Sequence, residues 1–127
     1  MSLTAAGWTA IASLLIGDAV KTAFNNANAY LGVGDTATAF NSAQTDLAAS
    51  SNKKRIGMDS TYPLRTANVI TFRSTFATGD ANWAWAENGI FNAGPTGGDM
   101  LTRAVETLIT KTSAVSVVFT KTLTIQS

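Results

Sequence analysis

Cysteine and histidine are both absent from this 127-residue chain. Their absence excludes disulfide bridges, cysteine nucleophiles and histidine general bases, and it removes the ligands of nearly every zinc or iron site. We therefore expect no metal, no cofactor and no catalytic residue set. An enzyme built on this chain would need a carboxylate or a Ser/Lys mechanism, and no motif supports either.

Charge is also scarce, because only 13% of the residues are charged and the net charge is +1. This balance gives no electrostatic reason to expect a nucleic-acid or membrane partner. The one basic cluster, residues 53–55, is interpreted as a solvated turn. Polarity comes instead from 29 serine and threonine residues. A surface this poor in charge suits burial against other subunits.

No apolar run is long enough to cross a membrane. The stretch Leu3 to Ile16 is interrupted by Thr4, Thr9 and Ser13, and no basic flank precedes it. It predicts neither a secretory signal nor a membrane span. We expect the protein to be made and kept in the cytosol until it assembles.

Alternation of apolar and hydroxyl residues dominates the second half of the chain. In the run from Val115 to Ile125, Phe119 and Leu123 share one face while Thr120, Thr122 and Thr124 share the other. A period of two predicts a half-buried antiparallel strand. Further strands are predicted at 29–33, 55–59, 69–76, 83–91 and 100–109, with turns rich in glycine between them.

These elements predict a mainly β fold, an antiparallel β-sandwich or small barrel with one N-terminal α-helix. The chain is expected to form a single domain over 1–127, with the helix within 1–17 and the sandwich over 29–125. Residues 36–53 are predicted to form a long ordered loop, and long loops in compact domains are often functional or interface-forming.

The helix is predicted over 5–16, with Thr4 as its N-cap and Gly17 as its stop. Its apolar stripe consists of residues spaced three and four apart: Trp8, Ile11, Ala12 and Leu15. Such a stripe usually packs in a core. Because further apolar residues widen it, we also expect part of the helix to face a partner. The residues expected at an interface are Trp8, Ile11, Leu15, Phe40 and Leu47.

Two motifs invite a binding or catalytic interpretation. Gly32-Val-Gly34-Asp35 lacks the third glycine of a dinucleotide site and the lysine of a P-loop, so it predicts a turn. Glu87 and Glu106 have the residue type of a glycosidase pair, but nothing in the sequence brings them together. A buried ion pair of Glu87 with Arg73 or Arg103 explains this acid equally well.

Trp83 and Trp85 lie two residues apart and would share one strand face. With Glu87 they would form a ligand platform for sugars, which stack on exposed indoles. Tryptophans are also enriched in cores and interfaces, and this interpretation is favoured here.

The order of several short motifs resembles small structural proteins of tailed bacteriophages, in particular tail-fibre and collar-type modules. The matching pieces are Leu3-Thr-Ala-Ala-Gly7, Leu31-Gly-Val-Gly-Asp35, Val69-Ile-Thr-Phe72, Glu87-Asn-Gly-Ile-Phe91 and Gly97-Gly-Asp-Met-Leu101, followed by a threonine-rich end. The chain departs from the pattern in residues 40–62 and in ending at Ser127 after its last strand. We therefore expect a compact assembly piece, such as a capsid decoration protein or a short tail or collar component.

The leading hypothesis is thus a non-enzymatic virion structural protein that docks on a capsid or tail surface. The resemblance implies a homo-oligomer, with a trimer favoured, and contacts with other virion proteins after assembly in the host cytoplasm. The alternative is a carbohydrate-binding module that uses Trp83 and Trp85.

Overall fold

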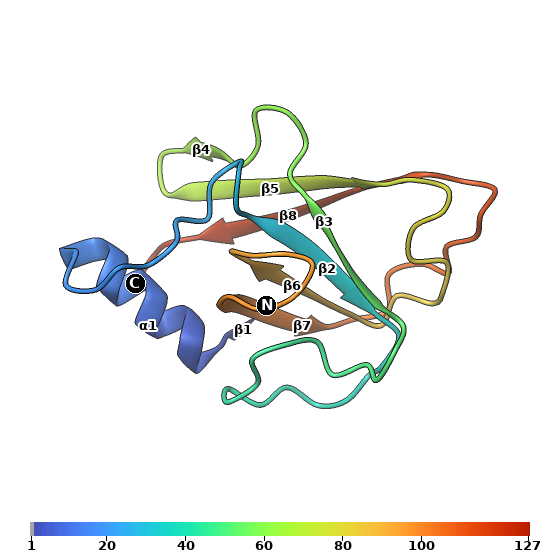
Figure 1. The fold of residues 1–127 in the computed structure, drawn as a ribbon, viewed down its shortest axis with the longest axis horizontal. Helices are drawn as coiled ribbons and strands as arrows, with labels where there is room; N and C mark the ends of the chain where they lie inside the picture. The colour runs from blue at the N-terminus through green and yellow to red at the C-terminus, as the bar shows by residue number, and fades with distance from the viewer. Residues whose placement is uncertain (1) are drawn as a thin grey trace.

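Two antiparallel sheets face each other in the computed structural model, which describes residues 2–127 (Figure 1). The fold is mainly β, with 35% strand and 10% helix, and it forms no closed barrel. The predicted β-sandwich with one N-terminal helix is therefore confirmed, and the alternative of a small barrel is wrong. The strands are β1 (Ser2–Leu3), β2 (Tyr30–Gly34), β3 (Lys53–Gly57), β4 (Leu64–Thr66), β5 (Val69–Phe76), β6 (Glu87–Phe91), β7 (Met100–Val105) and β8 (Val117–Thr124).

The larger sheet has the order β1-β7-β6-β2-β3, and the smaller has the order β4-β5-β8. The hydrophobic core lies between them. Strands β5 and β8 pair along their full length, from Val69 opposite Thr124 to Phe76 opposite Val117. Phe76 and Phe119 turn inward onto Trp85, with ring centroids 4.8 and 5.7 Å from the indole. The alternation predicted from the sequence is confirmed in both strands.

Helix α1 (Ala5–Ile16) begins and ends where the sequence predicts. The Thr4 side chain accepts a hydrogen bond from the Gly7 amide, and Gly17 ends the helix in the left-handed conformation with φ of 68°. The buried side of the helix consists of the small residues Gly7, Ala10 and Ser13. A side chain at position 7 would overlap the carbonyl oxygen of Leu101 on β7, so glycine allows the helix backbone to lie directly on the sheet.

This close packing turns the apolar stripe of the helix outward. Trp8 is 61% exposed and Leu15 is 82% exposed, while Ile11 is half-buried. The usual core placement of such a stripe is therefore wrong for this helix. The reason is steric: the helix approaches the sheet through its smallest residues, and the large ones do not fit at that distance. The last residues of the chain lie beside α1 (Figure 1).

Two predicted strands are longer than those observed. β6 begins only at Glu87, and β7 ends at Val105. The segment before β6 and the segment after β7 are joined by fewer hydrogen bonds. The Trp85 N–H donates to the Ile109 carbonyl (2.7 Å), and the Lys111 N–H donates to the Trp83 carbonyl (3.1 Å). An isolated bridge between Ala84 and Thr110 continues the pairing there, although the regular ladder has ended.

Two predicted turns are strand residues instead. Gly32 and Gly34 lie within β2, and the basic residues 53–55 lie on β3, where Arg55 is buried. In the region of the predicted long loop, neither helix nor strand occurs from 35 to 52, and Lys53 already begins β3. No helix in the described part of the chain, residues 2–127, has the length and apolar character that a membrane span requires.

Candidate functional site

A fully buried ion pair holds the long loop on the larger sheet. Glu87 on β6 and Arg103 on β7 are both 0% exposed, and Arg103 Nε donates to Glu87 Oε1 at 2.8 Å. The two residues are diagonal neighbours, because Glu87 is opposite Val105 and Arg103 is opposite Gly89. Of the two cation partners considered for Glu87, Arg103 is confirmed.

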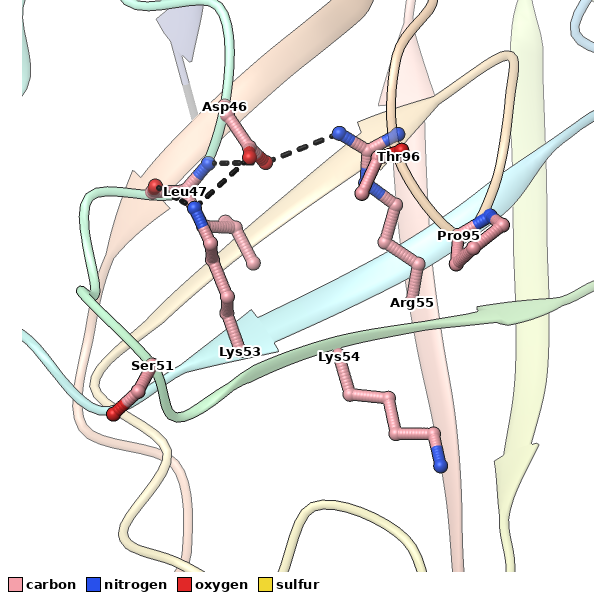
Figure 2. Close-up of a pocket in the computed structure, with 8 residues that line it drawn as sticks. All are labelled: Asp46, Leu47, Ser51, Lys53, Lys54, Arg55, Pro95 and Thr96. Carbon is pink, nitrogen blue, oxygen red and sulfur yellow. Dashed lines mark hydrogen bonds and ion pairs between the residues drawn. The ribbon is translucent and has the colours of Figure 1, made fainter.

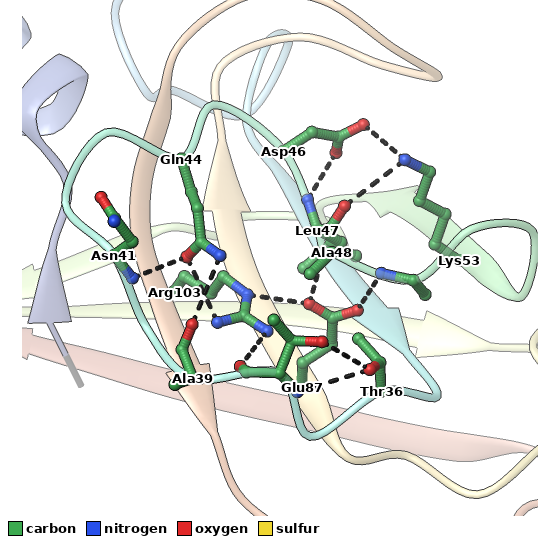
Figure 3. Close-up of polar contacts among 12 residues, drawn as sticks. Thr36, Ala39, Asn41, Gln44, Asp46, Leu47, Ala48, Lys53, Glu87 and Arg103 are labelled. Carbon is green, nitrogen blue, oxygen red and sulfur yellow. Dashed lines mark hydrogen bonds and ion pairs between the residues drawn. The ribbon is translucent and has the colours of Figure 1, made fainter.

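Further hydrogen bonds of the pair bind the long loop, through three backbone groups and one side chain (Figure 3). The two carboxylate oxygens of Glu87 accept from the amides of Ala48 and Ala49, each at 2.8 Å. Arg103 donates to the Thr38 carbonyl (2.8 Å) and to Gln44 Oε1 (3.3 Å). We call this arrangement the loop clamp. A buried charge is tolerated only when it is paired and hydrogen-bonded, and both conditions are met here.

Glycine in β2 makes room for the clamp. A Cβ at Gly34 would overlap the Glu87 carboxylate, and a Cβ at Gly32 would lie 2.9 Å from the Phe91 ring and 3.2 Å from Leu47. A Cβ at either position would fit only if these side chains moved. The Gly-x-Gly motif is therefore part of strand β2, and its lack of side chains leaves room for the Glu87 carboxylate, Phe91 and Leu47.

A second polar cluster lies beside β3, around an open cavity of about 390 Å³ (Figure 2). Asp46 accepts hydrogen bonds from Lys53 and Arg55, both at 3.0 Å. The Arg55 guanidinium lies over the Phe91 ring at 3.6 Å and donates to two loop carbonyls, those of Ala93 and Gly97, at 2.8 Å. Its charge is thus compensated by Asp46, and it makes three hydrogen bonds within the chain.

Partial burial raises the pKa of the Asp46 carboxyl, but hydrogen bonds from Lys53 and Arg55 outweigh burial and hold the pKa below its usual value. Asp46 is therefore ionised at neutral pH. The cluster fastens the long loop to β3 at Asp46, between two residues that the loop clamp holds, Gln44 and Ala48. Among residues 2–127, no three acidic side chains come together as a metal site would require.

The residues of the expected ligand platform lie mostly in the interior. Trp85 is 1% exposed, and its indole Nε1 donates to the Ala81 carbonyl at 2.9 Å. Trp83 is half-buried, and Glu87 belongs to the loop clamp. A sugar cannot stack on a buried indole, so this placement does not support a platform. Glu106 does not join Glu87 either, because it pairs with Lys121 at 2.8 Å.

The residues expected at an interface divide into two groups. Trp8 and Leu15 are exposed on α1, and Ile11 lies between them on the same stripe. Phe40 is half-buried in the long loop. Leu47 is 4% exposed and packs within its own chain, against Phe91 and Met100. The expectation for Leu47 is therefore wrong, because the loop clamp draws this part of the loop inward.

Several ionic residues of the fold carry no recognisable signal in the sequence. Lys111 is 2% exposed, and its ammonium group donates to Asn82 Oδ1 at 2.7 Å. Asp46 and Arg55 meet only because the loop folds back on β3. Their sequence separations follow no motif, so the contacts depend on tertiary structure alone.

In comparisons with known proteins, no protein-family model matches this chain and no curated protein matches its sequence.

Proposed function

We propose that this chain is a non-enzymatic structural protein of a tailed-phage virion. In this proposal it is an oligomeric β-module that docks on the capsid or tail surface, as a decoration protein or a tail-fibre or collar component. The observation that carries the proposal is the outward apolar stripe of α1. Large exposed apolar patches on soluble proteins mark surfaces that other molecules cover.

The charges of the chain support an architectural role. Six of its eight acidic side chains are in ion pairs: Asp46, Asp59, Asp80, Glu87, Asp99 and Glu106. The most buried of these pairs fixes a loop rather than lining a cleft. Side chains committed in this way favour a rigid assembly piece over a site that binds and releases a substrate.

The resemblance to tail-fibre and collar-type modules supplies the phage part of the proposal. Its motifs now have structural roles, since Gly34 and Glu87 of two matching segments meet in the loop clamp. Partners in this proposal are other copies of the chain and other virion proteins. Burial of Trp85 leaves only the half-buried Trp83 to support the carbohydrate-binding alternative.

The test is whether the protein is part of the particle. Virions of the phage that encodes the chain are purified through a density gradient, and their proteins are identified by mass spectrometry. We expect the chain at a fixed copy number per particle, and gold-labelled antibodies at one position on capsid or tail. Purified virions that lack the chain, from cells that express it, would refute the proposal.

A further inference from the structure

The exposed side of α1 has the size and character of a protein interface. Leu15 and Ile16 are 82% and 73% exposed, and Trp8 is 61% exposed. With Ile125, which follows β8, they offer on the order of 500 Å² of apolar surface, comparable to the largest patch on a typical monomer. No charged residue occurs from Ser2 to Gly17.

The apolar stripe carries both a cavity and a side chain that projects from it. At its N-terminal half, Trp8 and Ile11 line a groove of about 150 Å³ together with Leu3 and residues 123–126. Leu15 projects from its C-terminal half. Because seven residues separate Leu15 from Trp8, the two lie about 10 Å apart along one side of the helix.

We propose that α1 pairs with α1 of a second copy of this chain across a two-fold axis. The two helices run antiparallel, so that Leu15 of each copy enters the groove beside Trp8 and Ile11 of the other. A two-fold contact requires that one residue meets another reciprocally, and a groove and a projection on the same stripe satisfy this requirement. Ala12 lies near the axis, where a small side chain allows the helices to approach closely.

Two observations favour a second copy as the occupant. A surface without charge meets its own copy without repulsion, whereas a charged patch would repel itself. Two such faces together bury at most on the order of 1,000 Å², which is about the area that a specific interface needs. This inference rests on the oligomeric part of the proposed function, and it replaces the trimer expected from the sequence by a dimer.

Sedimentation equilibrium of the full chain tests the pairing. We expect a dimer for the wild type and a dissociation constant raised at least about 100-fold for Leu15→Lys, because two leucine anchors are lost per dimer. The control is Val118→Thr, since Val118 is 58% exposed but lies on β8 outside the stripe. It should leave the dimer intact. A monomeric or trimeric wild type overturns the inference, as does a dimer that Leu15→Lys leaves unchanged.

A charge exchange tests the antiparallel arrangement. Trp8→Glu should also prevent dimers, but an equal mixture of Leu15→Lys and Trp8→Glu chains should recover them. In the mixed dimer, lysine of one copy meets glutamate of the other, and the second contact remains Leu15 against Trp8. Circular dichroism confirms that each variant is folded. If the mixture stays monomeric while both variants are folded, the antiparallel pairing is wrong.

The outcomes separate this inference from the proposed function. A dimer that is absent from virions leaves the pairing intact and refutes the virion role. A monomeric protein that is found in virions refutes the pairing and leaves the virion role intact.

Discussion

Replacing Glu87 by glutamine tests the loop clamp with the smallest change of shape. The glutamine amide has one oxygen and one NH₂ group where the carboxylate had two oxygens. One of the amides of Ala48 and Ala49 would then face a donor instead of an acceptor, and Arg103 would lose its counter-charge in a fully buried position. Both effects act on the folded state alone, because in the unfolded chain water solvates these groups.

The expected cost is large. Removing one partner of a buried ion pair destabilises a protein by about 3–5 kcal/mol, mostly because the other charge is left uncompensated. Domains of this size unfold with about 5–15 kcal/mol, so the variant should remain folded in mild conditions but with a large part of its stability lost. Replacing Arg103 by methionine in the same chain removes the uncompensated charge. The double variant should therefore lose less than the sum of the two single variants.

Urea unfolding followed by tryptophan fluorescence measures the loss. The control is Glu106→Gln, which removes an acid whose side chain is 41% exposed from its pair with Lys121. That change should cost less than about 1 kcal/mol, because water screens exposed pairs. Limited proteolysis should also cut the Glu87→Gln variant first within residues 36–49. A Glu87→Gln variant within about 1 kcal/mol of the wild type would refute the reasoning.

Two further predictions concern glycine and pH. Gly34→Ala should destabilise the fold by about 2–4 kcal/mol, because the added Cβ displaces the Glu87 carboxylate. Gly57→Ala should be nearly neutral, since the atom nearest to its added Cβ lies 3.7 Å away. Equal urea midpoints for the two variants would contradict this prediction. The hydrogen bond from Lys121 lowers the pKa of Glu106 below its ordinary value of 4.5 in the folded chain. The pair therefore stabilises the fold above pH 4.5, and this contribution is lost as the pH falls through the lowered pKa. Urea midpoints of the wild type and of Glu106→Gln should differ slightly at pH 6 and converge towards pH 3, and a difference that grows on acidification would be inconsistent with the pair.

The sequence predicted those helices and strands that are defined by residues close together in the chain. Helix α1 depends on a cap at Thr4 and a glycine stop at Gly17, and β5 depends on strict alternation over 69–76. Both were predicted with their observed bounds. The side that a helix buries depends on its partner, however. An apolar stripe is usually buried in the core, and the sequence could not show whether Trp8 and Leu15 would face the core or a partner; the approach of α1 to β7 through Gly7 turns them outward.

The candidate site was less predictable because its contacts join distant parts of the chain. The sequence marked Glu87 as an unusual acid and named Arg103 as one of two partners. It did not predict the loop amides that complete the clamp, since backbone groups leave no trace in the residue pattern. The glycines of β2 were visible as a motif, but their role depends on side chains from β6 and from the loop.

The loop clamp also sets an order for folding during synthesis. Residues 36–49 leave the ribosome before Glu87 and well before Arg103, and at about 5–20 residues per second they wait on the order of seconds for these partners. During that time no ion pair holds the loop, and Leu47 has neither Phe91 nor Met100 to pack against. A nascent chain arrested before Arg103 should therefore expose this loop to proteases, and the loop should become protected only when β7 has joined the sheet.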